Sequence, residues 1–77
     1  MADISTKVLN IISQVLHKAV DELEMDTLFA DQAIDEFDVI EMIMKLEDHF
    51  GIIMQDTQVA EFSSLQDIID HVSDLVE

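Results

Sequence analysis

The sequence contains no cysteine, proline, tryptophan, tyrosine or arginine, and Gly51 is its single glycine. Without cysteine, disulfides, thiolate-bound zinc and thiol chemistry are excluded. With no proline and one glycine, the chain lacks the turn residues that an all-β domain needs. No apolar run approaches the ~18 residues of a membrane-spanning helix, and the N-terminus lacks the features of a signal peptide. We therefore expect a cytoplasmic protein that does not insert into a membrane.

Basic residues are also scarce: three lysines accompany 18 acidic residues, giving a formal net charge of −15 in 77 residues. Nucleic acid and anionic membrane surfaces are poor partners for such a chain, because phosphate binding depends on Lys and Arg. Hydrophobic residues nevertheless make up 49% of the sequence, more than an acidic disordered tail contains. We expect a monomer with one folded domain over residues 1–77 and the thin core of a small domain.

Helical periodicity predicts an all-α fold. Apolar residues at positions 4, 8, 11, 12, 15 and 19 fall on one helix face, so a first helix is expected at about residues 3–19, capped by Asp3. Residues 20–35 are less periodic and form a long acidic connection, of a length that is uncommon in compact domains and often functional.

The second helix has clear start and stop signals. Asp35 is a good N-cap, Glu36 and Asp38 place negative charge in the first turn, and Gly51 can end the helix in a left-handed conformation. Its wide apolar face is expected to consist of Phe37, Ile40, Ile43, Met44, Leu46 and Phe50.

Two further helices complete the predicted fold. Asp56 can cap a short helix through Phe62, and Ser63 or Ser64 can cap a last helix that carries Leu65 and the apolar positions after it. The expected architecture is a small helical bundle of three main helices plus one short helix, with a long first loop.

This layout, with Asp35-Glu36-Phe37-Asp38 opening the second helix, resembles the acyl carrier protein family over essentially the whole chain. The similarity is clearest in residues 41–50, EMIMKLEDHF, and it continues in residues 60–70, AEFSSLQDIID. In that family, a serine in an Asp-Ser-Leu motif is esterified with phosphopantetheine, whose thiol carries acyl groups. The corresponding triplet here is Asp35-Glu36-Phe37.

Glu36 has no hydroxyl, and its carboxylate repels an incoming phosphate. No hydroxyl residue lies between Thr27 and Thr57 to replace the serine. We therefore expect no cofactor: Glu36 marks a lost attachment site, and phosphopantetheine cannot be attached there. Either the chain is a diverged relative or the serine of a working carrier protein was replaced. Departures from the family pattern at the neighbouring residues Gln32, Ala33 and Phe37 favour divergence.

The resemblance implies that acids on and near the second helix dock on basic surfaces of synthase-type or regulatory proteins. A solvated helix face is the simpler interpretation of such a charge run, and Lys45 interrupts it. The charge of −15 exceeds what solubility requires, which favours docking. The residues that match the docking positions are Asp35, Asp38, Glu41, Asp48 and Asp56.

Neither catalysis nor metal binding is expected. The sequence has no nucleophile–base pair and no phosphate loop, and His17, His49 and His71 lack the spacing that brings two ligands together on one helix. The resemblance also implies walls of an acyl pocket, but bulky side chains among these positions favour a filled core. The positions are Phe37, Met44, Leu46, Met54, Val59, Phe62 and Ile68.

The predicted function is that of an acyl-carrier-protein-like binding module of fatty acid or polyketide metabolism, which docks on basic partners through its acidic second helix. The first alternative is a genuine acyl carrier protein with its modified serine replaced. The second is an acidic helical adaptor unrelated to that family.

Overall fold

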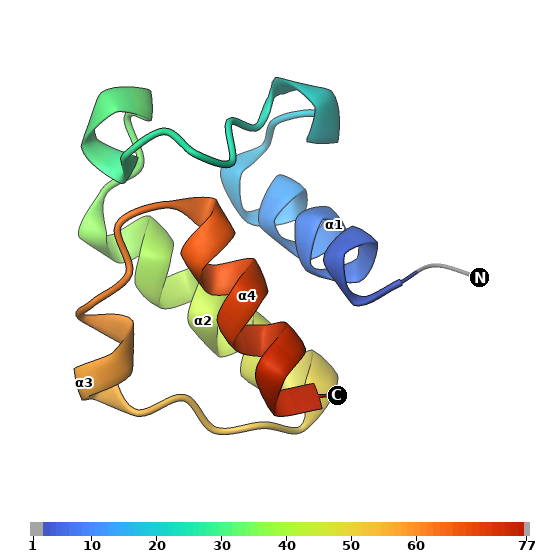
Figure 1. The fold of residues 1–77 in the computed structure, drawn as a ribbon. Coiled ribbons are helices and arrows are strands. Elements are labelled where there is room, and N and C mark those ends of the chain that lie inside the picture. Colours follow the sequence, from blue (N-terminus) through green and yellow to red (C-terminus); the bar gives the residue numbers. More distant parts are fainter. Residues whose placement is uncertain (1–2, 77) are drawn as a thin grey trace.

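The computed structural model describes residues 3–76 and shows a helical bundle (Figure 1). Within this range, one isolated antiparallel bridge, Leu28–Ser64, is present and no strand is formed. The predicted all-α class, with three main helices and one short helix, is confirmed. The elements are α1 (Ile4–Leu16), η1 (Val20–Glu22), η2 (Phe29–Gln32), α2 (Glu36–Phe50), α3 (Asp56–Val59) and α4 (Leu65–Val76), where η marks a 3₁₀ turn.

The core forms where α1 packs against both α2 and α4. Figure 1 shows the short α3 on the opposite side of α2 and α4 from α1. Each long helix contributes side chains that are removed from solvent, which is how a chain of this length assembles a core. The largest fully buried side chains are Val8, Ile12, Met42, Leu46, Leu65, Ile68 and Val72.

The first helix begins as predicted and ends earlier. The Asp3 carboxylate accepts a hydrogen bond from the Thr6 N–H at 2.8 Å, which caps α1. The helix stops at Leu16 instead of residue 19, because His17 adopts a left-handed conformation with φ of 57° and its N–H donates to the Ser13 carbonyl. Ala19, which was expected on the buried face, is therefore exposed outside the helix.

Both predicted ends of α2 are confirmed. The Asp35 carboxylate accepts from the Asp38 N–H at 2.9 Å, and the Asp38 carboxylate accepts from the Asp35 N–H at 3.3 Å. This reciprocal pair is a capping box, which satisfies two backbone donors at the helix start. At the other end, Gly51 takes φ of 65°, and its N–H donates to the Glu47 carbonyl.

The predicted apolar face of α2 was too wide. Met42, Ile43 and Leu46 are buried, but the side chains of Phe37 and Met44 are 79% and 58% exposed. Helix α1 packs against one side of α2, and the side that carries Phe37 and Met44 stays uncovered. One side of α2 therefore keeps apolar side chains in solvent.

The long connection between α1 and α2 is held by hydrogen bonds that the periodicity of the sequence does not predict. The side-chain amide of Gln32 donates to the carbonyls of Glu24 and Thr27, at 2.9 and 3.0 Å. Backbone bonds from Phe29 to Ser63 and from Gln66 to Met25 tie the connection to the start of α4. These contacts hold the connection, including η2, against the start of α4.

The last two helices differ from prediction in their details. Asp56 is the first residue of α3 and Gln55 is its cap, while the helix ends at Val59 instead of Phe62. Of the two predicted serines, Ser64 caps α4, since its hydroxyl oxygen accepts a hydrogen bond from the Asp67 N–H at 3.4 Å.

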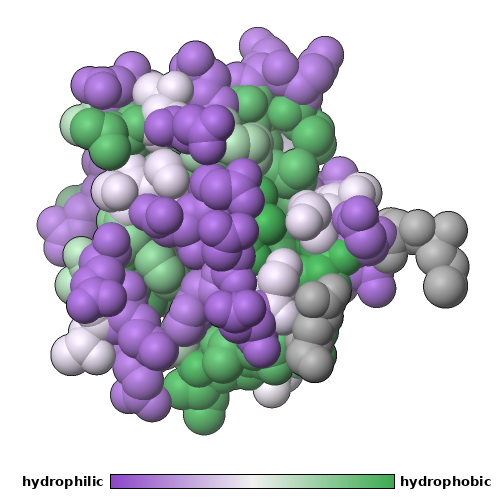
Figure 2. Space-filling view, in the orientation of Figure 1, coloured by the Kyte–Doolittle hydropathy of each residue, from purple (hydrophilic) through white to green (hydrophobic). Residues whose placement is uncertain are grey.

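Among residues 3–76, no helix is long and apolar enough to cross a membrane. Hydrophilic side chains line the front of the molecule where α4 runs, with hydrophobic ones showing between them (Figure 2).

Candidate functional site

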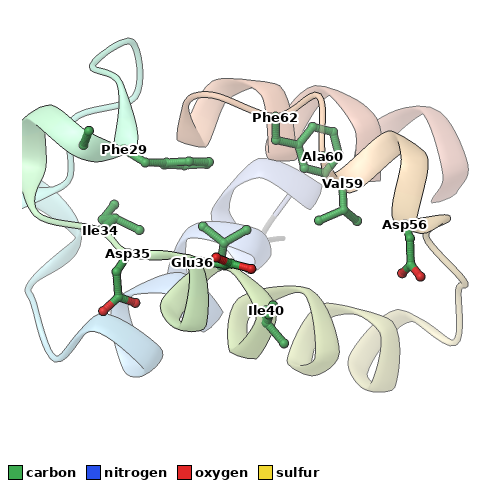
Figure 3. Close-up of a pocket in the computed structure, with 11 residues that line it drawn as sticks. Phe29, Ile34, Asp35, Glu36, Ile40, Asp56, Val59, Ala60 and Phe62 are labelled. Atoms are coloured by element: carbon green, nitrogen blue, oxygen red, sulfur yellow. The ribbon is translucent and has the colours of Figure 1, made fainter.

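An open apolar groove of about 550 Å³ lies beside the start of α2. Three segments form it: η2 with the residues that follow, the first turns of α2, and α3 with the chain leading to α4. In Figure 3, Phe29 and Phe62 lie on opposite sides of the groove, with Glu36 between them in this view. The apolar residues that line the groove are Phe29, Ala30, Ile34, Val39, Ile40, Val59, Ala60 and Phe62.

The polar lining of the groove is acidic throughout. It consists of Asp35, Glu36 and Asp56, and no lysine or histidine is among the described residues that line it. The Asp35 carboxylate is held by the capping box, whereas Glu36 and Asp56 stand on the first residues of α2 and α3 and are exposed. The groove thus combines an apolar lining with negative charge only.

The expectation of a filled core at the pocket-wall positions is correct for Leu46, Met54 and Ile68, which are buried. It is wrong for Phe37 and Met44, which are exposed on α2. Val59 and Phe62 are half-buried and line the open groove instead of filling it.

Sequence reasoning missed part of the groove, because Phe29, Ala30 and Ile34 come from a segment without periodicity. Phe29 and Ile34 lie in the long connection, where apolar residues scattered among acids show no periodicity that would indicate a direction. A large apolar residue within a polar connection was the available clue, since such residues usually need a packing partner.

The five predicted docking acids occupy three different settings. Glu41 and Asp48 are exposed on α2, and Asp38 is half-buried in the capping box. Asp35 belongs to both the capping box and the groove, while Asp56 lies on α3 at the groove. The structure therefore places Asp35 and Asp56 at different points along the groove (Figure 3) and leaves Glu41 and Asp48 exposed on α2.

The histidines are separated, and each is engaged locally. His17 ends α1, the His49 ring meets the Phe50 ring edge-on with centroids 4.8 Å apart, and His71 packs against Phe62 at 5.4 Å. Within the described residues, no group of three His, Asp or Glu side chains converges as metal ligands would.

The described residues thus form four α-helices and two 3₁₀ turns, with an apolar groove at the start of α2. The sequence model of the family described as "Phosphopantetheine attachment site" matches residues 6–72. The chain is 27% identical to the acyl carrier protein of Campylobacter hominis over 74 residues, covering 95% of this chain and 94% of that protein. It is 25% identical to the acyl carrier protein of Rickettsia bellii over 73 residues, covering 94% and 85%.

The chain therefore belongs to the phosphopantetheine-attachment-site family, and the predicted resemblance to acyl carrier proteins is confirmed. Membership contradicts the alternative of an unrelated acidic adaptor. The described residues do not fit covalent attachment of the family's group at this groove, because none of the residues that line it carries a hydroxyl.

Proposed function

We propose that this chain is a binding module of the acyl carrier protein type that acts without a covalently attached arm. It docks on basic surfaces of synthase-type or regulatory proteins of fatty acid or polyketide metabolism, as a cytoplasmic monomer. Glu36 occupies the position of the attachment serine, so the protein contributes recognition and not a thioester or catalysis.

One observation carries this proposal: α2 exposes an apolar stripe flanked by acids. Phe37, Ile40 and Met44 are 79%, 45% and 58% exposed and recur at helical spacing, with Glu41 and Asp48 beside them. We call these five residues the docking face. Large apolar side chains left in solvent together mark interaction surfaces.

The composition of the docking face matches a protein interface with an apolar centre and a charged rim. Aromatic and Met side chains provide the burial that holds a complex together, while rim charges mainly raise the association rate and select partners of opposite sign. With a net charge of −15, the whole molecule attracts a basic partner.

Charge reversal on the docking face tests the proposal. Glu41→Lys combined with Asp48→Lys should weaken binding to a purified synthase-type enzyme of the same organism by tenfold or more, as measured by calorimetry. Asp38 is left intact, because its carboxylate accepts the Asp35 N–H in the capping box. The matched control is Asp70→Lys with Asp74→Lys, which makes the same charge change on exposed positions of α4. Equal loss of binding in both variants would contradict docking through α2.

A working carrier protein with its serine replaced is the second candidate, and the open groove beside residue 36 favours it. Incubating the Glu36→Ser variant with a phosphopantetheinyl transferase and coenzyme A distinguishes this candidate from the proposed binding module. The replaced-serine candidate requires a mass gain of ~340 Da, the mass of the phosphopantetheine group. Our proposal expects no gain, because Gln32, Ala33 and Phe37 depart from the family pattern around the site.

A further inference from the structure

The half-buried His71, on α4, has a ring nitrogen that the fold buries without a partner. Its Nε2 atom is closed off from solvent and has no hydrogen-bond partner among the residues that the structure describes. The ring packs against that of Phe62, with centroids 5.4 Å apart and planes tilted by 59°. A buried nitrogen without a partner forfeits a hydrogen bond that water would supply. The position of the His71 ring therefore depends on its contact with Phe62 and not on polar pairing at Nε2.

Protonation of His71 changes this balance. A neutral imidazole carries one N–H, whereas an imidazolium donates from both nitrogens and carries a full positive charge. In the packed position, the Nε2–H of an imidazolium would be buried with no acceptor, which costs far more than burial of the neutral ring. Histidine is the side chain whose charge ordinarily changes between pH 5 and 8. Mild acidification therefore disfavours the packed position.

Acidic side chains beside α4 offer the protonated ring another position. His71 lines a polar hollow of about 340 Å³. No charged residue of α1, α2 or α3 is among the described residues that line it, and its other lining residues are Gln58, Glu61, Phe62, Asp67, Asp70 and Asp74. Asp67 is already hydrogen-bonded at the cap of α4, and Asp70 accepts from a side-chain amide. Asp74 is exposed and lies three residues after His71, where two side chains of one helix can meet.

Phe62 connects this hollow to the apolar groove. Its side chain lines both, and Figure 3 shows it across the groove from Phe29. Phe62 belongs to the segment between α3 and α4, outside either helix. Its position therefore depends on the side chains that pack against it, and departure of the His71 ring would remove one of them.

We propose that His71 is a pH-sensitive switch on the wall of the groove. The neutral ring holds Phe62 in place. The protonated ring turns into the acidic hollow and pairs with Asp74, which releases Phe62 and loosens the side of the groove that Phe62 and Val59 form. This device is separate from docking through α2, because the docking face contains none of these residues.

NMR spectra of the isotopically labelled protein between about pH 8 and about pH 5.5 test the proposal, because histidines titrate in this range while ordinary carboxylates stay ionised. Nuclear Overhauser contacts between the rings of His71 and Phe62 should be present at the upper end and lost at the lower end. The amides of Val59 and Ala60 should shift with the same midpoint as the His71 ring protons. Ring contacts that persist at the lower end, or groove amides that do not follow His71, would overturn the switch.

Two histidine variants separate the switch from a general effect of acid. His71→Phe keeps a ring against Phe62 but cannot titrate, so the pH-dependent shifts of Val59 and Ala60 should disappear. His49→Phe removes an exposed histidine on α2 and should leave these shifts unchanged. Shifts that survive in His71→Phe, or that disappear equally in His49→Phe, would overturn the proposal.

The pairing with Asp74 has a test of its own. Asp74→Asn should move the midpoint of the groove shifts to lower pH, because the protonated ring loses its partner. Asp21→Asn, which makes the same charge change at an exposed position of η1, is the matched control and should move the midpoint less. Equal displacement by the two variants would show that only the overall charge acts on the ring, and would overturn the pairing.

Discussion

At position 36 the chain places a carboxylate on the first residue of α2, beside the groove. A hydroxyl at this place could form a phosphate ester, whereas the ionised Glu36 carboxylate has no hydroxyl to offer and accepts hydrogen bonds. Single residues also decide how the helices begin. Asp35, Asp38 and Ser64 hold backbone donors that would otherwise lack partners.

Asp67 is the residue at which stability should depend most clearly on pH. One of its carboxylate oxygens accepts from the Ser63 N–H at 2.9 Å, the Ser63 hydroxyl at 3.1 Å and the Ser64 N–H at 3.3 Å. These bonds, the Ser63 N–H above all, lower the pKa of Asp67 below its ordinary value despite slight desolvation. The stabilisation is therefore present above the unfolded-state pKa of about 3.9 and is lost as pH falls through the folded-state pKa.

We expect Asp67→Ala to lower the free energy of unfolding by about 1–2 kcal/mol at pH 7. The difference from the unmutated chain should shrink below about pH 4, because protonation removes the same interaction. Urea denaturation at pH 7 and pH 3 measures it, with Asp70→Ala as control. A difference that stays constant over this range would show that the carboxylate charge is not responsible.

At Ala33, by contrast, we expect a substitution that raises the free energy of unfolding. Ala33 follows η2 in a left-handed conformation, with φ of 59°, where a Cβ is unfavourable. Ala33→Gly should therefore raise the free energy of unfolding by about 0.5–1 kcal/mol. Ala60→Gly is the matched control, since Ala60 has φ of −64° and should lose stability on the same change. Thermal denaturation that ranks the two variants in the reverse order would contradict the assigned backbone conformations.

At the scale of elements, the two sides of α2 have different surroundings. Its inner side supplies Met42, Ile43 and Leu46 to the core, and its outer side presents Phe37 and Met44 to solvent. The bundle has too few helices to cover both, so the outer side is available to a partner at no cost in core packing.

Met42 and Met44 provide a direct test of this division, since they are the same residue type two positions apart on one helix. Met42 is fully buried and Met44 is 58% exposed. We expect Met42→Ala to cost about 2–5 kcal/mol of stability and Met44→Ala to change it by less than about 0.5 kcal/mol. Partner binding should respond to Met44→Ala only. Similar losses of stability in chemical denaturation would contradict the orientation of α2.

For the whole molecule, the charge of −15 is balanced by only three lysines and works against the compact state through self-repulsion. A thin core makes this term important, because a domain of this size is only marginally stable. Acids lie on the long connection, on α2 and along the groove, so their carboxylates repel one another across the surface.

The thermal midpoint should therefore rise with added salt. Raising NaCl from about 10 mM to about 150 mM shortens the screening length from roughly 30 Å to roughly 8 Å, so much of the repulsion between exposed carboxylates disappears. Calorimetric scans across this range should show a steady increase, and Asp70→Asn with Asp74→Asn should make the slope smaller. A midpoint that does not move with salt would show that the charges are too dispersed to interact.

The sequence by itself determined the helical class, the ends of α2 and the presence of a carboxylate at position 36. These features depend on local chemistry: periodic apolar residues, an Asp at an N-cap, a glycine that accepts positive φ, and the identity of one side chain. The end of α1 was missed because His17 adopts a conformation that only glycine would have signalled.

Only the tertiary structure decided which side of α2 is buried and where the groove lies. Periodicity shows that Ile40, Ile43 and Met44 are apolar, but their burial depends on how much of α2 the other helices cover. The groove likewise forms only where η2, α2 and α3 meet. The hydrogen bonds of Gln32 and Phe29 that hold η2 in place join residues that no periodic pattern connects. The acids were visible in the sequence, while the position of Asp35, Glu36 and Asp56 along one apolar groove follows from packing alone.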